Sequence, residues 1–243
     1  MPLRIFKQLF FNFPESRRNK IEDFILTSAN QNAYLYSLEC SKWLSNITVI
    51  NGAGGTGKSF FASFWQNNNN AVNLDLFKIN EHKLDRILNK NNNFVFDDFD
   101  KYFTRKYLMR NLDKHNFESF DQTFIKIFEH IKSENKHMLL TSSVPAHKIP
   151  FKTPDLSSRV TAATSFDLAA PTDRDIKAMV IKKFSDLQLS ISAEVTDLIS
   201  SNANNSYVTA AKIIDDLNQL SLTEKKNINV SLVKHALKEN NAK

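Results

Sequence analysis

The sequence predicts an α/β fold with a five-stranded parallel sheet, followed by a small all-helical domain. Strand and helix patterns alternate from residue 47 to residue 168, which is typical of parallel sheets. Only helical patterns follow Pro171. In addition, all four glycines of the 243 residues lie between Gly52 and Gly57, in a turn that joins a predicted strand to a predicted helix.

The first half of the predicted sheet domain contains three strands and three helices. Apolar side chains on one broad face predict a helix over 30–44, and the apolar run Ile47–Ile50 predicts the strand before the turn. A helix rich in aromatic residues begins at Lys58. A strand over 71–76, a helix over 81–88 and a strand over 94–96 continue the alternation.

The second half begins with a long helix and ends with two strands, over 137–141 and 164–168. The apolar stripe of the long helix runs from Phe117 to Ile131, and we interpret it as core rather than as a stacking surface. The helices of the C-terminal bundle are predicted over 173–187, 193–201, 207–220 and 230–238. Pro171 and Thr172 are its start signal.

Composition indicates a globular protein and sets limits on its partners. The net charge of +6 is scattered, so it permits contact with nucleic acid without requiring it. The single cysteine, Cys40, excludes a disulfide framework and favours a reducing compartment. The six histidines show no metal-ligand spacing, and no apolar run suggests a signal peptide or membrane span, so we expect a cytoplasmic protein without membrane contact.

The glycine-rich turn has the pattern of a phosphate-binding loop, with Gly52, Gly54, Gly55, Thr56, Gly57, Lys58 and Ser59 as its predicted nucleotide-binding residues. Its backbone N–H groups and the start of the following helix are suited to hold phosphates. We expect Lys58 to reach the β and γ oxygens and the Ser59 hydroxyl to coordinate Mg²⁺.

Two carboxylates, Asp97 and Asp98, follow the buried run that ends at Phe96. We assign Asp97 to Mg²⁺ and Asp98 to the attacking water of a slow or conditional hydrolysis. Ser143, after the next strand, is the candidate sensor of the γ-phosphate, although a serine there can equally cap a helix.

Arg159 lies shortly before the last predicted strand. From such a position an arginine can reach a neighbouring subunit and stabilise the charge that develops on its γ-phosphate. The alternative is a surface arginine that forms a local salt bridge.

The order and spacing of these motifs resemble those of the Hda-type regulators in the DnaA family of AAA+ ATPases. The resemblance runs nearly from end to end. It is carried by Glu22–Ile25, Ser28–Asn30 with Ala33, the loop at Gly52–Ser59, Phe96–Asp98, Leu140–Ser142 and Asp155–Arg159. It implies an AAA+ P-loop NTPase fold with residues 21–170 as the nucleotide-binding domain and 171–243 as the helical lid.

The resemblance also implies cofactors and partners. ADP or ATP with Mg²⁺ would be bound, and an arm over residues 1–20 would bind the sliding clamp, the β subunit of DNA polymerase III. Gln8, Leu9, Phe11 and Phe13 match the clamp-binding motif. Arg159 would act on ATP-bound DnaA and so restrain replication initiation. Because the chain ends at Lys243, we expect no helix-turn-helix domain and mainly indirect contact with DNA.

One position departs from the family. Val208 stands where a lid arginine would sense the nucleotide, and Lys212 lies one turn further on. We therefore expect the chain to activate a partner's ATPase rather than to turn over ATP rapidly itself. A DnaC-type helicase loader, a small-molecule kinase and a nucleotide-binding module without activity stay open as alternatives, as does assembly into a homo-oligomer.

Overall fold

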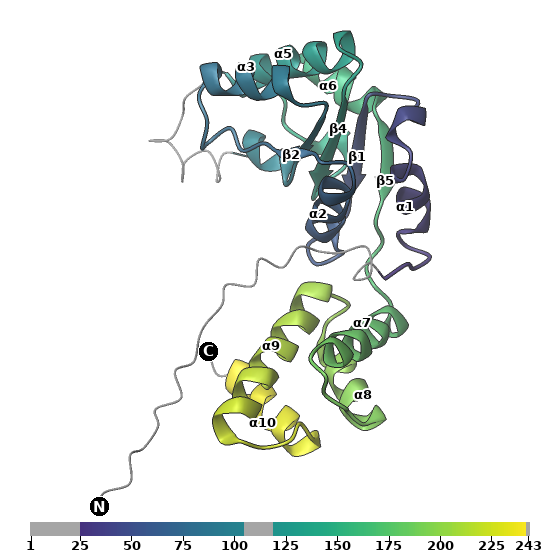
Figure 1. The fold of residues 1–243 in the computed structure, drawn as a ribbon, viewed down its shortest axis with the longest axis vertical. Coiled ribbons are helices and arrows are strands. Elements are labelled where there is room, and N and C mark those ends of the chain that lie inside the picture. The colour runs from purple at the N-terminus through teal and green to yellow at the C-terminus, as the bar shows by residue number, and fades with distance from the viewer. Residues whose placement is uncertain (1–24, 105–118, 242–243) are drawn as a thin grey trace, which may run out of the picture.

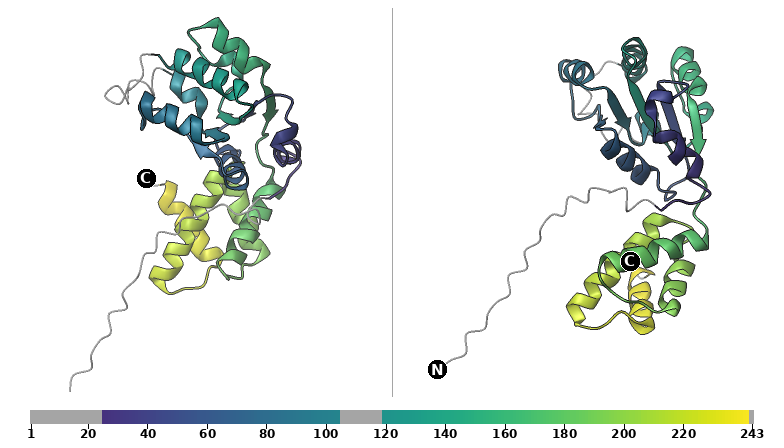
Figure 2. Two further views of the ribbon diagram at one scale, coloured as in Figure 1. Left: turned by 45° about the horizontal axis from the view of Figure 1, so that its top comes forward. Right: turned by 45° about the vertical axis from the view of Figure 1, so that its right-hand side comes forward.

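The computed structural model describes residues 25–104 and 119–241, which form an α/β domain and a helical lid (Figure 1). The two parts are separate lobes, linked by the segment that follows the last strand, as Figure 2 shows from two further sides. In the described ranges, no helix combines the length and apolar character needed to cross a bilayer.

The sheet confirms the predicted class. Its strands are β1 (Ile47–Asn51), β2 (Val72–Asn73), β3 (Asn93–Phe96), β4 (His137–Ser142) and β5 (Thr164–Asp167). They pair in the order β2-β3-β4-β1-β5, and every pair is parallel. The central strands are apolar because helices cover both faces of the sheet.

Alternate residues of the strands face two different cores. Phe94 and Phe96 belong to the larger core, together with α3 (Glu81–Lys90), α5 (Phe120–Ser133) and α6 (Pro154–Ala162). Val95 belongs to the smaller core on the other face, together with α1 (Gln31–Ser37) and α2 (Lys58–Asn68). This two-residue period is the one expected for strands buried on both sides.

The aromatic stripe of α5 lies in the larger core, as predicted. Phe124 is fully buried, and its ring packs against Phe96 and Phe99 with centroids 4.9 and 4.8 Å apart. Phe117 lies outside the described residues. On the other face, Trp43 stacks on the fully buried Trp65 with centroids 5.3 Å apart.

The structure differs from the prediction at α1, at β2 and at an additional helix, α6. The helix predicted over 30–44 ends at Ser37, because the chain must turn back for the Trp43 indole to donate a hydrogen bond to the Tyr36 carbonyl. The strand predicted over 71–76 is only β2, since the chain after it bends into a turn closed by Lys78 N–H and Asp75 O. Helix α6 was not predicted, although Pro154 at its start is a common first helical residue.

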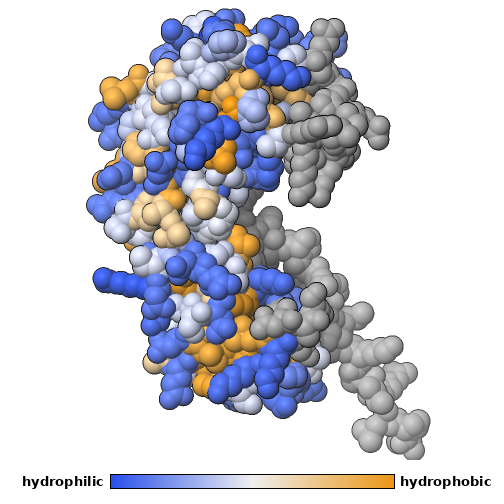
Figure 3. Space-filling model, turned by 180° about the vertical axis from the view of Figure 1, so that it is seen from behind, coloured by the Kyte–Doolittle hydropathy of each residue, from blue (hydrophilic) through white to orange (hydrophobic). Residues whose placement is uncertain are grey.

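The lid consists of α7 (Asp173–Asp186), α8 (Ala193–Asn202), α9 (Tyr207–Glu224) and α10 (Val230–Asn241). Thr172 caps α7 in a reciprocal pair with Asp175, which explains the start signal in the sequence. The lid helices enclose their own apolar core, in which Phe184 is fully buried. Further apolar atoms gather on the lid surface seen from behind (Figure 3).

Candidate nucleotide site

The glycine-rich loop connects β1 to α2, and its shape requires glycine at three positions. Gly55 and Gly57 have φ angles of 84° and 97°, a conformation that side chains disfavour. A Cβ at Gly52 would lie 2.7 Å from the Thr56 hydroxyl and 2.8 Å from the Leu168 carbonyl. Gly54 differs, because a Cβ there would meet nothing within 4 Å.

Lys58 is buried in the loop without a counter-charge. Its side chain is 6% exposed, and its ammonium donates to the carbonyls of Gly52 at 2.7 Å and Ala53 at 3.0 Å. No carboxylate of the described residues pairs with it. Burial of an unpaired ammonium costs free energy, so this loop is suited to an anion such as a polyphosphate.

Asp97 and Asp98 occupy different environments at the end of β3. The Thr141 hydroxyl donates to Asp97 at 2.6 Å and accepts the Asp98 N–H at 2.8 Å. Asp98 has the left-handed φ of 57°, and its carboxylate forms an ion pair with Lys101. Asp97 is therefore fixed by a neutral hydroxyl, whereas Asp98 is already engaged by a cation.

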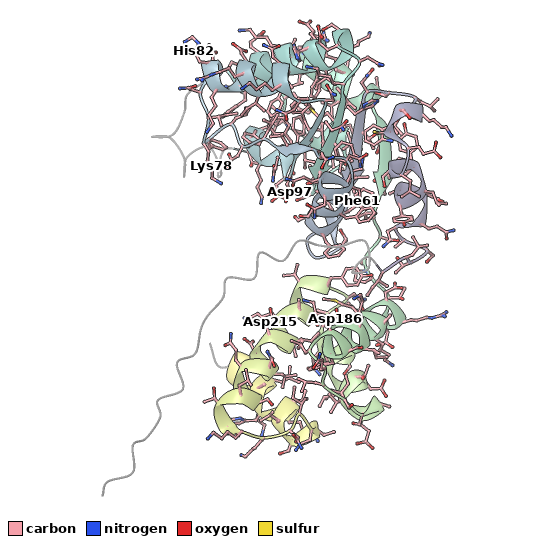
Figure 4. All side chains as sticks on the ribbon, viewed as in Figure 1. Phe61, Lys78, His82, Asp97, Asp186 and Asp215 are labelled. Carbon is pink, nitrogen blue, oxygen red and sulfur yellow. The ribbon has the colours of Figure 1, made fainter. Side chains whose placement is uncertain are left out.

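The metal assignment made from the sequence fits these surroundings. Asp97 lies at the end of the sheet nearer the lid, where α2 begins (Figure 4). A carboxylate and the exposed Ser59 side chain offer the oxygen ligands that Mg²⁺ prefers. Their role as metal ligands stays a prediction.

Thr141 is a site residue that sequence reasoning missed, and the sheet register explains it. Leu140 pairs with Phe96, so Thr141 and Asp97 are the next residues of adjacent parallel strands. The predicted sensor, Ser143, lies two residues further on, and its backbone N–H donates to Asp100 at 3.1 Å. Its hydroxyl as a phosphate sensor stays a prediction.

Arg159 forms local ion pairs, as expected if it were an ordinary surface arginine rather than one that acts on another subunit. It lies on α6 and binds Asp155 at 2.8 Å and Glu129 at 3.0 Å. The hydrogen bond with Asp155, followed by the charges of both carboxylates, holds its pKa above the ordinary value. The side chain is still 31% exposed, so a partner can reach it.

A cavity of about 310 Å³ lies between α1 and β5. Leu168, whose carbonyl contacts Gly52, connects two residues of its wall, Asp167 and Ala169. Asn51 donates to Ser165, which also lines the cavity, while the buried Asn51 amide oxygen has no hydrogen-bond partner among the described residues. A cavity lined by apolar side chains together with a few polar ones is suited to the nucleoside part of a ligand.

The lid reaches the loop through the start of α9. The Tyr207 N–H donates to the Gly55 carbonyl at 2.9 Å. Val208, where the lid arginine was expected, is 67% exposed, and Lys212 is also exposed. The clamp-binding residues predicted from the sequence, Gln8 to Phe13, lie outside the described residues.

Comparisons with solved structures connect this geometry to known proteins. Domain III of the Thermotoga maritima replication initiation protein DnaA is 19% identical, with a TM-score of 0.73 over 93% of this chain and 98% of that one. The chain has a DnaA-like AAA+ fold. The Thermotoga maritima RuvB Holliday junction branch migration motor shares this AAA+ fold at 13% identity, with a TM-score of 0.68 over 91% of this chain and 72% of that one.

An AMPPCP-bound DnaA from Aquifex aeolicus is 18% identical, with a TM-score of 0.65 over 84% of this chain and 66% of that one. No protein-family model and no curated protein matches the sequence. The structural likeness thus confirms the predicted AAA+ P-loop fold.

Proposed function

We propose that this AAA+ chain binds ADP or ATP with Mg²⁺ and acts in the control of replication initiation. The observation that carries the nucleotide assignment is the buried Lys58, which no carboxylate of the described residues neutralises. The loop N–H groups and Lys58 would hold the phosphates, and Ser59 and Asp97 would hold Mg²⁺. The cavity between α1 and β5 would receive the nucleoside.

We further propose that the chain is an Hda-type adaptor rather than a fast ATPase. Two groups that would assist hydrolysis are not available. Asp98 is paired with Lys101, and valine occupies position 208, where an arginine was expected. Arg159 is exposed enough to exchange its pairs with Asp155 and Glu129 for the γ-phosphate of a bound partner. That partner would be ATP-bound DnaA, met at the DNA-loaded sliding clamp.

The division into an arm over 1–20, a nucleotide domain over 21–170 and a lid over 171–243 belongs to the same proposal. The arm would dock on the clamp with Gln8, Leu9, Phe11 and Phe13. The fold likeness to domain III of DnaA supports the nucleotide domain and the lid, whereas the arm rests on the resemblance of its motif. The adaptor would work in the cytoplasm.

An ATPase assay with DnaA, DNA-loaded clamp and this chain tests the adaptor function. The wild-type chain should accelerate hydrolysis by DnaA, and Arg159→Ala should remove about a thousandfold or all of that acceleration. Glu129→Gln is the matched control, since it weakens one ion pair of Arg159 and keeps the guanidinium group. Acceleration that is unchanged in Arg159→Ala would refute the role of this residue.

Size-exclusion chromatography with the clamp tests the partner. A complex formed by the wild-type chain should be lost in the Gln8→Ala, Phe11→Ala double variant. If the wild-type chain forms no complex with the clamp but does form one with a replicative helicase, the helicase-loader alternative is supported.

A further inference from the structure

Helix α6, which carries Arg159, is too short to be stable by itself. It has nine residues, whereas isolated helices shorter than about 12 residues are marginal in water. Its apolar face packs against the sheet domain, because Leu156 and Val160 are buried in the larger core. Polar contacts with α5 add directional constraints that apolar packing does not supply.

The start of α6 is bound to a buried carboxylate of α5. Asp121 is 2% exposed, and its Oδ2 accepts the Lys152 N–H at 2.8 Å, the Thr153 N–H at 3.0 Å and the Thr153 hydroxyl at 3.2 Å. Thr153 stands at the N-cap position of α6, but in the described helix its hydroxyl caps no N–H group of α6 and donates to Asp121 instead. The negative charge of Asp121 lies beside the N-terminus of α6, where the helix dipole favours it. Helix α5 thus supplies the anchor for the start of α6.

A second contact joins the same two helices at Arg159. Its guanidinium binds Asp155, one turn earlier on α6, and Glu129 of α5. Glu129 lies roughly two turns after Asp121, and Arg159 lies a little less than two turns after Thr153. The two helices therefore run in the same direction, with one contact at the start of each and the other further along. A shift at the start of α6 would move the guanidinium relative to Glu129.

We propose that Asp121 is a positioning residue for Arg159, because it fixes the start of α6 on α5 and so determines where the guanidinium is presented to a partner's γ-phosphate. The inference rests on the proposed action of Arg159 on DnaA. It adds that this action depends on a buried carboxylate that does not itself reach the partner. A charged group stabilises a transition state only in the correct geometry, so a small displacement of α6 costs a large part of the rate.

The ATPase assay with DnaA and DNA-loaded clamp tests this inference when the chain is titrated. The titration separates the maximal acceleration from the concentration of the chain that gives half of it. Asp121→Ala should lower the maximal acceleration about tenfold, because Arg159 is displaced. It should change the half-maximal concentration by less than about twofold, because the exposed surface is kept. Asp121→Asn retains an oxygen acceptor for the same donors and should restore most of the acceleration.

Asn80→Ala is the matched control in the same domain. It removes the cap of α3, since the Asn80 side chain accepts the Lys83 N–H at 3.0 Å. Loss of this cap should lower the unfolding temperature and leave the acceleration unchanged. Thr153→Val covers the case in which Asp121→Ala does not fold, because it removes only the hydroxyl contact. It should lower the maximal acceleration about threefold.

Hydrogen exchange of the chain alone gives a measurement that does not need the partner. Exchange over residues 152–162 should be faster in Asp121→Ala than in the wild type, and Asp121→Asn should bring it back close to the wild-type rate. Unchanged exchange in this segment would overturn the inference.

The inference would also be overturned by wild-type acceleration in Asp121→Ala, or in Thr153→Val if Asp121→Ala does not fold. A change confined to the half-maximal concentration, or an equal loss of acceleration in Asn80→Ala, would have the same meaning. A wild-type chain that does not accelerate hydrolysis by DnaA would instead refute the adaptor function on which the inference rests.

Discussion

The α/β domain and the lid meet at the same loop but contribute different chemistry. The α/β domain presents a buried ammonium at Lys58 and a carboxylate at Asp97. The lid presents a backbone N–H, a hydroxyl and an aromatic ring from Ser206 and Tyr207. The difference indicates that the proposed phosphate binding and the lid–loop contact depend on different groups, the first on charge and the second on packing.

The largest effect is expected when the positive charge of Lys58 is removed from the α/β domain. Lys58→Ala should weaken binding of ADP by about a hundredfold or more, measured by calorimetry, because the phosphates lose their buried cation. Some thermal stability without nucleotide should also be lost, because the carbonyls of Gly52 and Ala53 lose their donor.

Lys136→Ala is the matched control for Lys58→Ala. Lys136 is equally buried, but its ammonium donates to the Leu88 carbonyl at 2.6 Å, at the end of α3. This control should lose stability and keep its affinity for ADP. Equal loss of affinity in both variants would contradict the separate role of Lys58.

The next largest effect is expected from a core substitution in the lid, which tests whether the lid unfolds independently of the sheet. Phe184→Ala should cost about 3–5 kcal/mol in the lid core. Hydrogen exchange followed by mass spectrometry should show faster exchange in α7 to α10 and unchanged exchange in the sheet. Phe124→Ala should reverse this pattern. Faster exchange in both parts of a single variant would show that the two regions unfold as one unit.

A smaller effect concerns the hydroxyl between the two carboxylates. Thr141→Val should cost about 1–3 kcal/mol of stability, measured by thermal unfolding, because the Asp98 N–H loses its acceptor. It should also weaken the Mg²⁺-dependent part of nucleotide binding. Thr48→Val is the control, since the buried Thr48 hydroxyl has no hydrogen-bond partner in the described part of the chain and its removal should cost little. Similar losses in both variants would count against the bridging role of Thr141.

The smallest effect is a pH dependence confined to the α/β domain. Burial lowers the pKa of His137 from 6.5, and its ring packs edge-on against Trp43. The unfolded chain therefore takes up this proton more readily than the folded one, and stability should fall as pH drops below 6.5. The loss should stay below about 1 kcal/mol because the ring is partly exposed. His137→Gln should flatten this slope in thermal unfolding, and an unchanged slope would assign it to other groups.

Local patterns predicted most of the fold, whereas contacts between distant residues were harder to foresee. The strands β1 and β3 and the loop follow from short runs such as Ile47–Ile50, because burial on both faces leaves a clear apolar signal. The end of α1 at Ser37 depends on Trp43 packing on Trp65, a contact that helical periodicity does not encode. Thr141 lies within the motif Leu140–Ser142, but its bridge between the two aspartates could be found only from the register of β3 with β4.

The contact of Tyr207 with the loop could not be predicted for a similar reason. The sequence points to Val208 as the position of interest, because that is where the resemblance leads one to expect an arginine. The adjacent tyrosine carries no motif, and its importance depends on where α9 begins relative to Gly55 and Gly57. Motifs predicted the phosphate side of the site, and only the three-dimensional structure revealed the lid side.

The stacked pair Trp43 and Trp65 has an optical consequence. The sequence contains two tryptophans, and both belong to this pair in the α/β domain. Intrinsic tryptophan emission therefore reports on one half of the molecule, and movement or melting of the lid alone leaves it nearly constant. A tryptophan introduced at the exposed Leu222 of α9 would make the lid visible in the same spectrum.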